Sequence, residues 1–128
     1  MHINKITSTI LRAAFEVHTQ LGPGLLESAY EACLAYELTQ MGLLAETQKP
    51  LPLDYKEVRM ECGFRVDLFV EREVIIEIKS VELVHEIHLT QVLTYMKLMN
   101  KEIGLILNFN VRKMKDGIKR VILTPENN

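Results

Sequence analysis

Three charged residues stand in segments that are otherwise apolar. Asp67 interrupts the run GFRVDLFV, and Glu77 and Lys79 close the run VIIEIK. Residues two apart in an extended strand project from the same face, so Glu77 and Lys79 would lie roughly 6–7 Å apart, with Ile78 pointing the other way. The E-x-K pattern alone is also typical of a strand that emerges into solvent with an exposed ion pair.

Two carboxylates and an amine in this arrangement are suited to hydrolysing a phosphodiester. That reaction needs an activated water and positive charge against the developing pentavalent phosphate. Two neighbouring carboxylates repel each other unless a cation lies between them, and Mg²⁺ takes oxygen ligands and keeps several waters. A lysine beside the cation can orient the attacking water or release its proton more readily than a free lysine. Asp67, Glu77 and Lys79 are therefore the candidate catalytic centre, with Mg²⁺ or Mn²⁺ as the cofactor.

This chemistry requires Asp67 and Glu77 to meet across a hairpin. Residues 64–70 alternate as a strand with one apolar face, and the polar turn 71–73 separates them from residues 74–79. Residues 74–79 are almost wholly apolar, as expected of a strand covered on both faces. Pairing around this turn would bring Asp67 near the level of Glu77.

The remaining elements follow from hydrophobic periodicity. Apolar residues at helical spacing predict a helix over about 3–20, and Gly22-Pro23-Gly24 breaks it. A second helix carries Leu26 to Met41 and ends at Gly42, and Pro50 and Pro52 mark the next strand as an edge strand. A helix over about 84–100 and strands at 103–109 and 118–123 complete the order α-α-β-β-β-α-β-β. We expect one domain over 1–128, an α/β fold with a central mixed β-sheet flanked by helices.

Composition limits the class of protein. With 128 residues, 48% hydrophobic and 25% charged, the chain has the composition of a soluble globular domain. No apolar run approaches the ~20 residues that span a bilayer, and the first residues do not resemble a signal peptide. We therefore expect a cytoplasmic protein without a membrane partner. Two cysteines are too few for a disulfide framework or a zinc ribbon.

The net charge of −2 is unusual for a nucleic-acid binder, because phosphate neutralisation normally requires a basic face. A nuclease of this composition would bind its substrate weakly or depend on a partner protein that delivers it. The basic residues concentrate only near the C-terminal strand. They could hold the phosphate backbone, but a solvated sheet edge is the safer interpretation. These residues are Arg112, Lys113, Lys115, Lys119 and Arg120.

The helix after the candidate centre carries further polar residues. Gln91 and Tyr95 are four apart and share one helix face. His88 lies on the same stripe, three residues from His85. Two histidines without further ligands are weak evidence for zinc, and a helix-surface role is the simpler interpretation for His88.

The spacing D-x9-E-x-K across a hairpin, within this order of elements, resembles the PD-(D/E)XK nuclease superfamily and its restriction-endonuclease-like core. More closely, the chain resembles the small GxxExxY family: residues 24–30, GLLESAY, match the naming motif. The likeness continues through PLPLDYK, GFRVDL, EIKSVE, QVLTY and GLILNF. Val66 stands where the superfamily has its proline.

The resemblance implies roles for individual residues. It assigns Asp67 and Glu77 as metal ligands, with the carbonyl of Ile78, and Lys79 as the catalytic lysine. Glu27 matches a helix glutamate that reaches the metal directly or through water, although a first-turn acid interacting with the helix dipole is an equal alternative. Gln91 and Tyr95 match a Q-x3-Y motif that borders the active site on the substrate side.

The leading hypothesis is a Mg²⁺- or Mn²⁺-dependent nuclease that acts on nucleic acid, DNA rather than RNA. A competing hypothesis of another class is a catalytically inactive nuclease-fold protein that binds nucleic acid or a partner protein. A third is self-association into a homodimer through apolar residues of the first helix, which is compatible with either.

Overall fold

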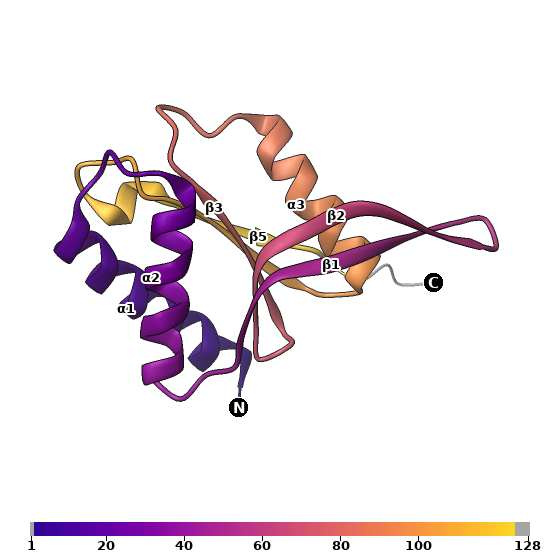
Figure 1. Ribbon diagram of the computed structural model, residues 1–128, viewed down its shortest axis with the longest axis horizontal. Helices are drawn as coiled ribbons and strands as arrows, with labels where there is room; N and C mark the ends of the chain where they lie inside the picture. Colours follow the sequence, from indigo (N-terminus) through magenta and orange to yellow (C-terminus); the bar gives the residue numbers. More distant parts are fainter. Residues whose placement is uncertain (1, 125–128) are drawn as a thin grey trace.

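A computed structural model describes residues 2–124. It contains a five-stranded sheet in the order β1-β2-β3-β4-β5, in which β3 and β4 are parallel and the other neighbours are antiparallel. This is the predicted α/β fold with a central mixed sheet (Figure 1). The elements are α1 (Ile3–Leu21), α2 (Glu27–Gln40), β1 (Ala45–Tyr55), β2 (Val58–Val70), β3 (Val74–Lys79), α3 (Glu86–Met99), β4 (Ile103–Asn108), the 3-10 turn η1 (Met114–Gly117) and β5 (Ile118–Ile122).

Helices α1 and α2 cover one face of the sheet. The apolar stripe predicted for α1 is buried, and it packs on alternate residues of β3 and β4 such as Ile76 and Leu105. Gly22 ends α1 with φ 66°, a left-handed conformation in which a residue without a Cβ is not strained. This layer holds α2 beside β3.

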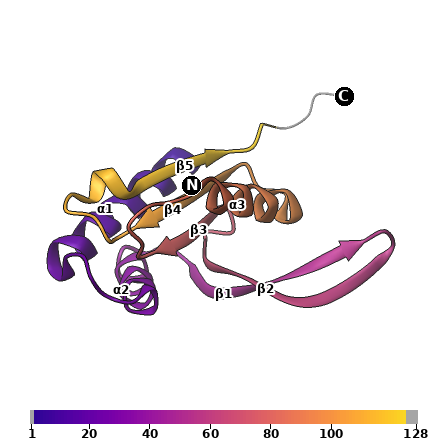
Figure 2. The ribbon, with the colours of Figure 1, turned by 90° about the horizontal axis from the view of Figure 1, so that it is seen from above.

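Helix α3 covers the opposite face (Figure 2), where Val92 and Met96 pack with Ile75 and Ile106 in a second core. The helix approaches the sheet closely at Gly104. A Cβ built there would lie 2.8 Å from Cγ1 of Val92 and 2.9 Å from Sδ of Met96. The missing side chain of Gly104 therefore sets the height of α3 above β4.

Strands β1 and β2 form a long antiparallel hairpin that was not predicted from the sequence. β2 begins at Val58 rather than near residue 64, and the two strands pair from Ala45↔Val70 out to Tyr55↔Val58. The outer half projects from the body (Figures 1 and 2). Tyr55 and Val58 are exposed there, so no buried face imprints a period on this segment. The prediction that the proline-containing strand lies at an edge is confirmed, since β1 is an outer strand.

In the part of the chain from residue 2 to 124, no helix combines the length and apolarity required to cross a bilayer.

Candidate active site

The ladder between β2 and β3 opens where Asp67 meets Glu77. Three pairs, from Val70↔Val74 to Leu68↔Ile76, continue toward the turn, and the next position places Asp67 opposite Glu77. There the backbone N–H of Ile78 donates to Oδ2 of Asp67 at 2.8 Å, and the N–H of Asp67 donates to Oε1 of Glu77 at 3.4 Å. Side-chain carboxylates thus replace main-chain acceptors, and the structure brings Asp67 and Glu77 together. We call them the carboxylate pair.

The electrostatics of the carboxylate pair favour a bound cation. Glu77 is only 6% exposed, and burial together with the charge of Asp67 raises the pKa of Glu77 to about 8. The hydrogen bond from the Asp67 backbone and the charge of Lys79 oppose this rise, whereas a hydrogen bond between the two carboxyl groups adds to it. Ionising both carboxyl groups is therefore unfavourable here, and a divalent cation bound between them would relieve both the repulsion and the desolvation.

Lys79 ends β3 on the same face as Glu77, and its side chain is half-buried. Its charge lowers the pKa of Glu77, and it is the second largest cause, after burial, of the lowered pKa of His88. None of the salt bridges among residues 2–124 includes Lys79. The ammonium group thus stands beside the carboxylate pair without a fixed ionic partner.

Glu27 approaches the end of β3 from the first turn of α2. Its Oε2 accepts a hydrogen bond of 3.0 Å from the backbone N–H of Ser80, whose Oγ donates to the carbonyl of Leu25 at 2.6 Å. Within the described range 2–124, no three His, Cys, Asp or Glu side chains are grouped to hold a metal ion. The structure therefore places Glu27 next to Ser80, and it does not join Glu27 to the carboxylate pair.

Tyr30 explains how the loop before α2 holds its shape. Its hydroxyl donates to the carbonyl of Gly22 at 2.6 Å and accepts from the N–H of Leu25 at 3.1 Å. Its fully buried ring stacks on Phe109 at the end of β4, with centroids 4.5 Å apart. The tyrosine of the GLLESAY segment is thus a structural anchor that fixes where Glu27 begins its helix.

Gln48 contacts the carboxylate pair, and Glu31 contacts Gln48; neither residue was predicted from the sequence. Nε2 of Gln48 donates to Oε1 of Glu31 at 2.6 Å and to Oδ1 of Asp67 at 3.2 Å. Burial raises the pKa of Glu31, the hydrogen bond from Gln48 lowers it, and the charge of Asp67 raises it. The only sequence signal was the spacing of Glu27 and Glu31, four apart on one face of α2.

Gln91 and Tyr95 lie on the α3 side of the site. Nε2 of Gln91 donates to the hydroxyl of Tyr95 at 3.0 Å. Burial, then the charge of Glu77, raises the pKa of Tyr95, so its hydroxyl lies in the field of the carboxylate pair. Both residues also line a hollow of about 320 Å³ between α3 and the β1–β2 hairpin, together with Leu53, Phe64, Ile87, Thr90, Thr94 and Leu98.

The two histidines near α3 form a helix start. The N–H of His85 donates to Nδ1 of His88 at 3.1 Å, an interaction that closes the first turn of α3. The rings are tilted, with centroids 5.8 Å apart. In residues 2–124 neither histidine belongs to a group of three or more side chains that could hold a metal ion.

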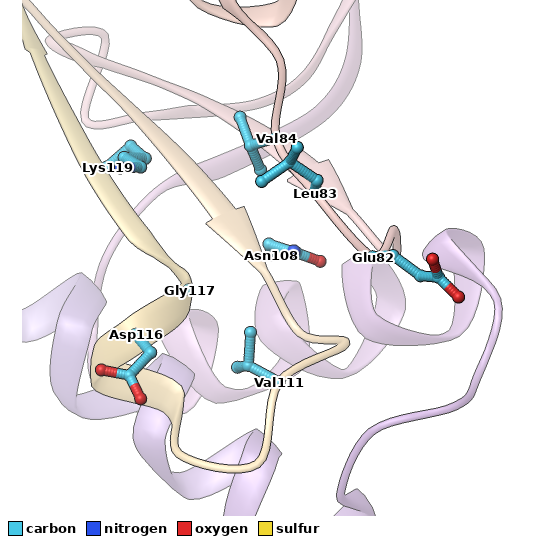
Figure 3. A pocket seen from close by; sticks show the side chains of 8 residues that line it. All are labelled: Glu82, Leu83, Val84, Asn108, Val111, Asp116, Gly117 and Lys119. Atoms are coloured by element: carbon cyan, nitrogen blue, oxygen red, sulfur yellow. The ribbon is translucent and has the colours of Figure 1, made fainter.

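A second hollow, of about 170 Å³, lies where β4 ends against η1 and the segment before α3 (Figure 3). Asn108 in its wall has its amide satisfied: Nδ2 donates to the carbonyl of Val81, and Oδ1 accepts from the N–H groups of Val81 and Asn110. Gly117 is required there, because a Cβ would lie 1.9 Å from the carbonyl oxygen of Asn108. The hydrogen bonds of Asn108 brace the loops on either side of this hollow.

The mixed sheet, the helices on its two faces and the acids at the open ladder define a restriction-endonuclease-like core. The family model of the PD-(D/E)XK nuclease superfamily matches residues 4–121, and the chain belongs to this superfamily. Comparison with curated proteins and comparison with solved structures each give no match. Nucleases of this superfamily generally use divalent metal ions, and the all-oxygen donors of the carboxylate pair suit Mg²⁺ or Mn²⁺.

Proposed function

We propose that this chain is a Mg²⁺- or Mn²⁺-dependent nuclease that hydrolyses phosphodiester bonds of DNA. The observation that carries the proposal is the meeting of Asp67 and Glu77 at the open ladder, where Glu77 is buried and its pKa is raised. A buried pair of like charges destabilises a fold unless a cation neutralises it. Within a superfamily of nucleases, the cation is the reason to keep such a pair.

In this proposal Asp67 and Glu77 hold the metal ion, and the carbonyl of Ile78 contributes a further oxygen. Glu27 supports the site from α2 through water, since its carboxylate is directed to the N–H of Ser80. When bound, the metal ion would supply Lewis acidity toward the phosphate and lower the pKa of a coordinated water. The hydrogen bond from the N–H of Ile78 fixes the direction in which Asp67 presents its oxygens.

Lys79 orients the attacking water in this scheme. Its ammonium group projects from the same strand face as Glu77 and has no salt-bridge partner in residues 2–124, so it is available to the water and to the charge of the phosphate. Gln91 and Tyr95 face the substrate side, where the hydroxyl of Tyr95 borders the hollow under the β1–β2 hairpin.

The finer relationship to the GxxExxY family is part of the proposal and is supported by the way Tyr30 anchors the loop that leads to Glu27. The net charge of −2 supports weak intrinsic affinity for DNA, so we also propose that a partner protein contributes to substrate binding.

The test is cleavage of linear DNA in Mg²⁺ or Mn²⁺ by the parent and by Asp67→Asn, Glu77→Gln and Lys79→Ala. Glu16→Gln is the control, because it removes an exposed carboxylate of α1 whose hydrogen bond is to Gln20. Cleavage by the parent and the control but not by the other three supports the proposal. Equal cleavage by all five proteins would indicate a contaminating nuclease and would refute the proposal.

A second candidate function is a nuclease-fold module that binds DNA or a partner protein without cutting. The net charge of −2 favours it, because proteins that bind DNA independently usually have an excess of basic residues. Calorimetry with Mn²⁺ separates the two functions. A module that has lost its chemistry has no need for metal at the carboxylate pair, whereas the proposed nuclease binds Mn²⁺ there and loses this binding in Glu77→Gln.

A further inference from the structure

Gln48 has an unusual backbone for its place in the fold. It adopts φ 48°, and it lies in the interior of β1. The other non-glycine residues with positive φ among residues 2–124 stand in turns or at a helix end: Lys56, Glu71, Arg72 and Asn100. A left-handed residue inside a strand is strained, so the surrounding structure must hold it there.

The left-handed backbone of Gln48 allows the β1–β2 hairpin to change which of its faces is turned toward each core. The pairing register is unchanged across it, from Thr47↔Leu68 to Lys49↔Val66. Yet Leu68 packs in the core under α1 and α2 and Val66 in the core under α3, although residues two apart in a strand normally share a face. The two faces of the hairpin therefore exchange sides at Gln48. Glycine would allow that turn with the least strain, so the choice of glutamine needs another reason.

The side chain of Gln48 supplies that reason by joining α2 to the carboxylate pair. Its amide nitrogen donates to Oε1 of Glu31 and to Oδ1 of Asp67, while the N–H of Ile78 donates to Oδ2 of Asp67. Both oxygens of Asp67 are therefore held, one by β3 and one by Gln48. Glu31 belongs to a helix that is anchored in the core by Leu34 and Leu38.

We propose that Gln48 is a positioning residue that orients the Asp67 carboxylate for cation binding, with Glu31 as its anchor on α2. The inference rests on the proposed function, since it assumes that Asp67 is a metal ligand. Groups that hydrogen-bond to metal ligands fix their orientation, and their loss typically weakens metal affinity about 10- to 100-fold.

Gln48→Gly separates the two roles, because glycine keeps the left-handed backbone and removes only the amide. We expect its urea unfolding midpoint to equal or exceed that of the parent, while its Mn²⁺ affinity by calorimetry falls about 10-fold or more. The matched control is Asn100→Gly, which places glycine at φ 56° at the end of α3 without a change of charge. The control should bind Mn²⁺ as the parent does.

Glu31→Ala tests the anchor. If Gln48 and Glu31 act as one unit, the double variant binds Mn²⁺ no more weakly than Gln48→Gly alone, whereas fully additive losses would remove Glu31 from the proposal. Unchanged Mn²⁺ affinity in Gln48→Gly would overturn the positioning role and leave the nuclease proposal standing. Absence of Mn²⁺ binding in the parent would instead refute the proposed function, and this inference with it.

Discussion

Two buried polar side chains on neighbouring strands differ in how fully the surrounding protein hydrogen-bonds them. Asn108 on β4 is 3% exposed, and its amide makes three hydrogen bonds to backbone groups of the adjoining loops. Glu77 on β3 is 6% exposed, and its carboxylate accepts one long bond of 3.4 Å and lies against a second carboxylate. The Asn108 amide is thus held by hydrogen bonds to its neighbours, whereas the Glu77 carboxylate is not.

The difference distinguishes a structural polar group from a functional one. A satisfied amide braces loops and has little hydrogen-bonding capacity left for a ligand. A buried carboxylate with a raised pKa retains unused oxygen lone pairs and is stabilised when a cation binds. Strongly perturbed groups of this kind concentrate at functional sites. We therefore expect substitutions at Asn108 and at Glu77 to change different properties of the protein.

The largest expected effect is on cleavage. Glu77→Gln and Asp67→Asn remove one ligand charge each and keep the shape of the side chain. We expect each to lower the rate of DNA cleavage by about 100-fold or more, the size of effect seen when one charge-stabilising group is removed from an active site. Gel-based cleavage rates in Mn²⁺ measure this, with Glu16→Gln as control. A variant at the carboxylate pair that retained parental activity would contradict the assignment.

The next effect is on the pH dependence of stability without metal. The pKa of Glu77 in the folded chain, about 8, lies above its ordinary value of 4.5. Its contribution to stability is therefore complete at low pH and is lost as pH rises, since the unfolded state releases its proton first. Each pKa unit corresponds to about 1.4 kcal/mol.

Urea unfolding followed from about pH 5 to about pH 8 should show falling stability in the parent and a flatter profile in Glu77→Gln. Mn²⁺ at the upper end should restore the parent more than the variant. Parallel profiles for the two proteins would show that Glu77 does not titrate as described.

The parts of the fold and of the site that could be predicted from the sequence are those whose side chains are buried. The hairpin through Asp67 and Glu77, the two faces of β3 and the helices followed from apolar periodicity, because those segments pack on a core. Gln48 and Glu31 gave no such signal, since Gln48 is exposed and its left-handed backbone depends on how two strands turn over together. The outer end of the hairpin was missed for the same reason, because Tyr55 and Val58 are exposed there.

Asn108→Ala provides the opposite case. It leaves the N–H and carbonyl of Val81 without their partner, and an unsatisfied buried group costs about 1–3 kcal/mol. We expect a lower urea midpoint with Mn²⁺ affinity at the carboxylate pair retained. Loss of metal affinity without loss of stability would erase the distinction between the two buried residues.

The smallest effect is expected at Tyr95. Tyr95→Phe keeps the buried ring and removes the hydroxyl that accepts from Gln91. One hydrogen bond contributes about 0.5–1.5 kcal/mol, so cleavage should fall by less than about tenfold. We expect the loss to lie in KM if the hydroxyl contacts substrate. An unchanged KM with a lower kcat would move Tyr95 from the substrate side to the catalytic step.

The central claim is that Asp67 and Glu77 bind one divalent ion between them. Anomalous diffraction from crystals soaked in Mn²⁺ tests it most directly. We expect a manganese peak that both carboxylates ligate, together with the loss of that peak in Glu77→Gln crystals. A peak elsewhere with an empty carboxylate pair, or no bound manganese at saturating Mn²⁺, would contradict it.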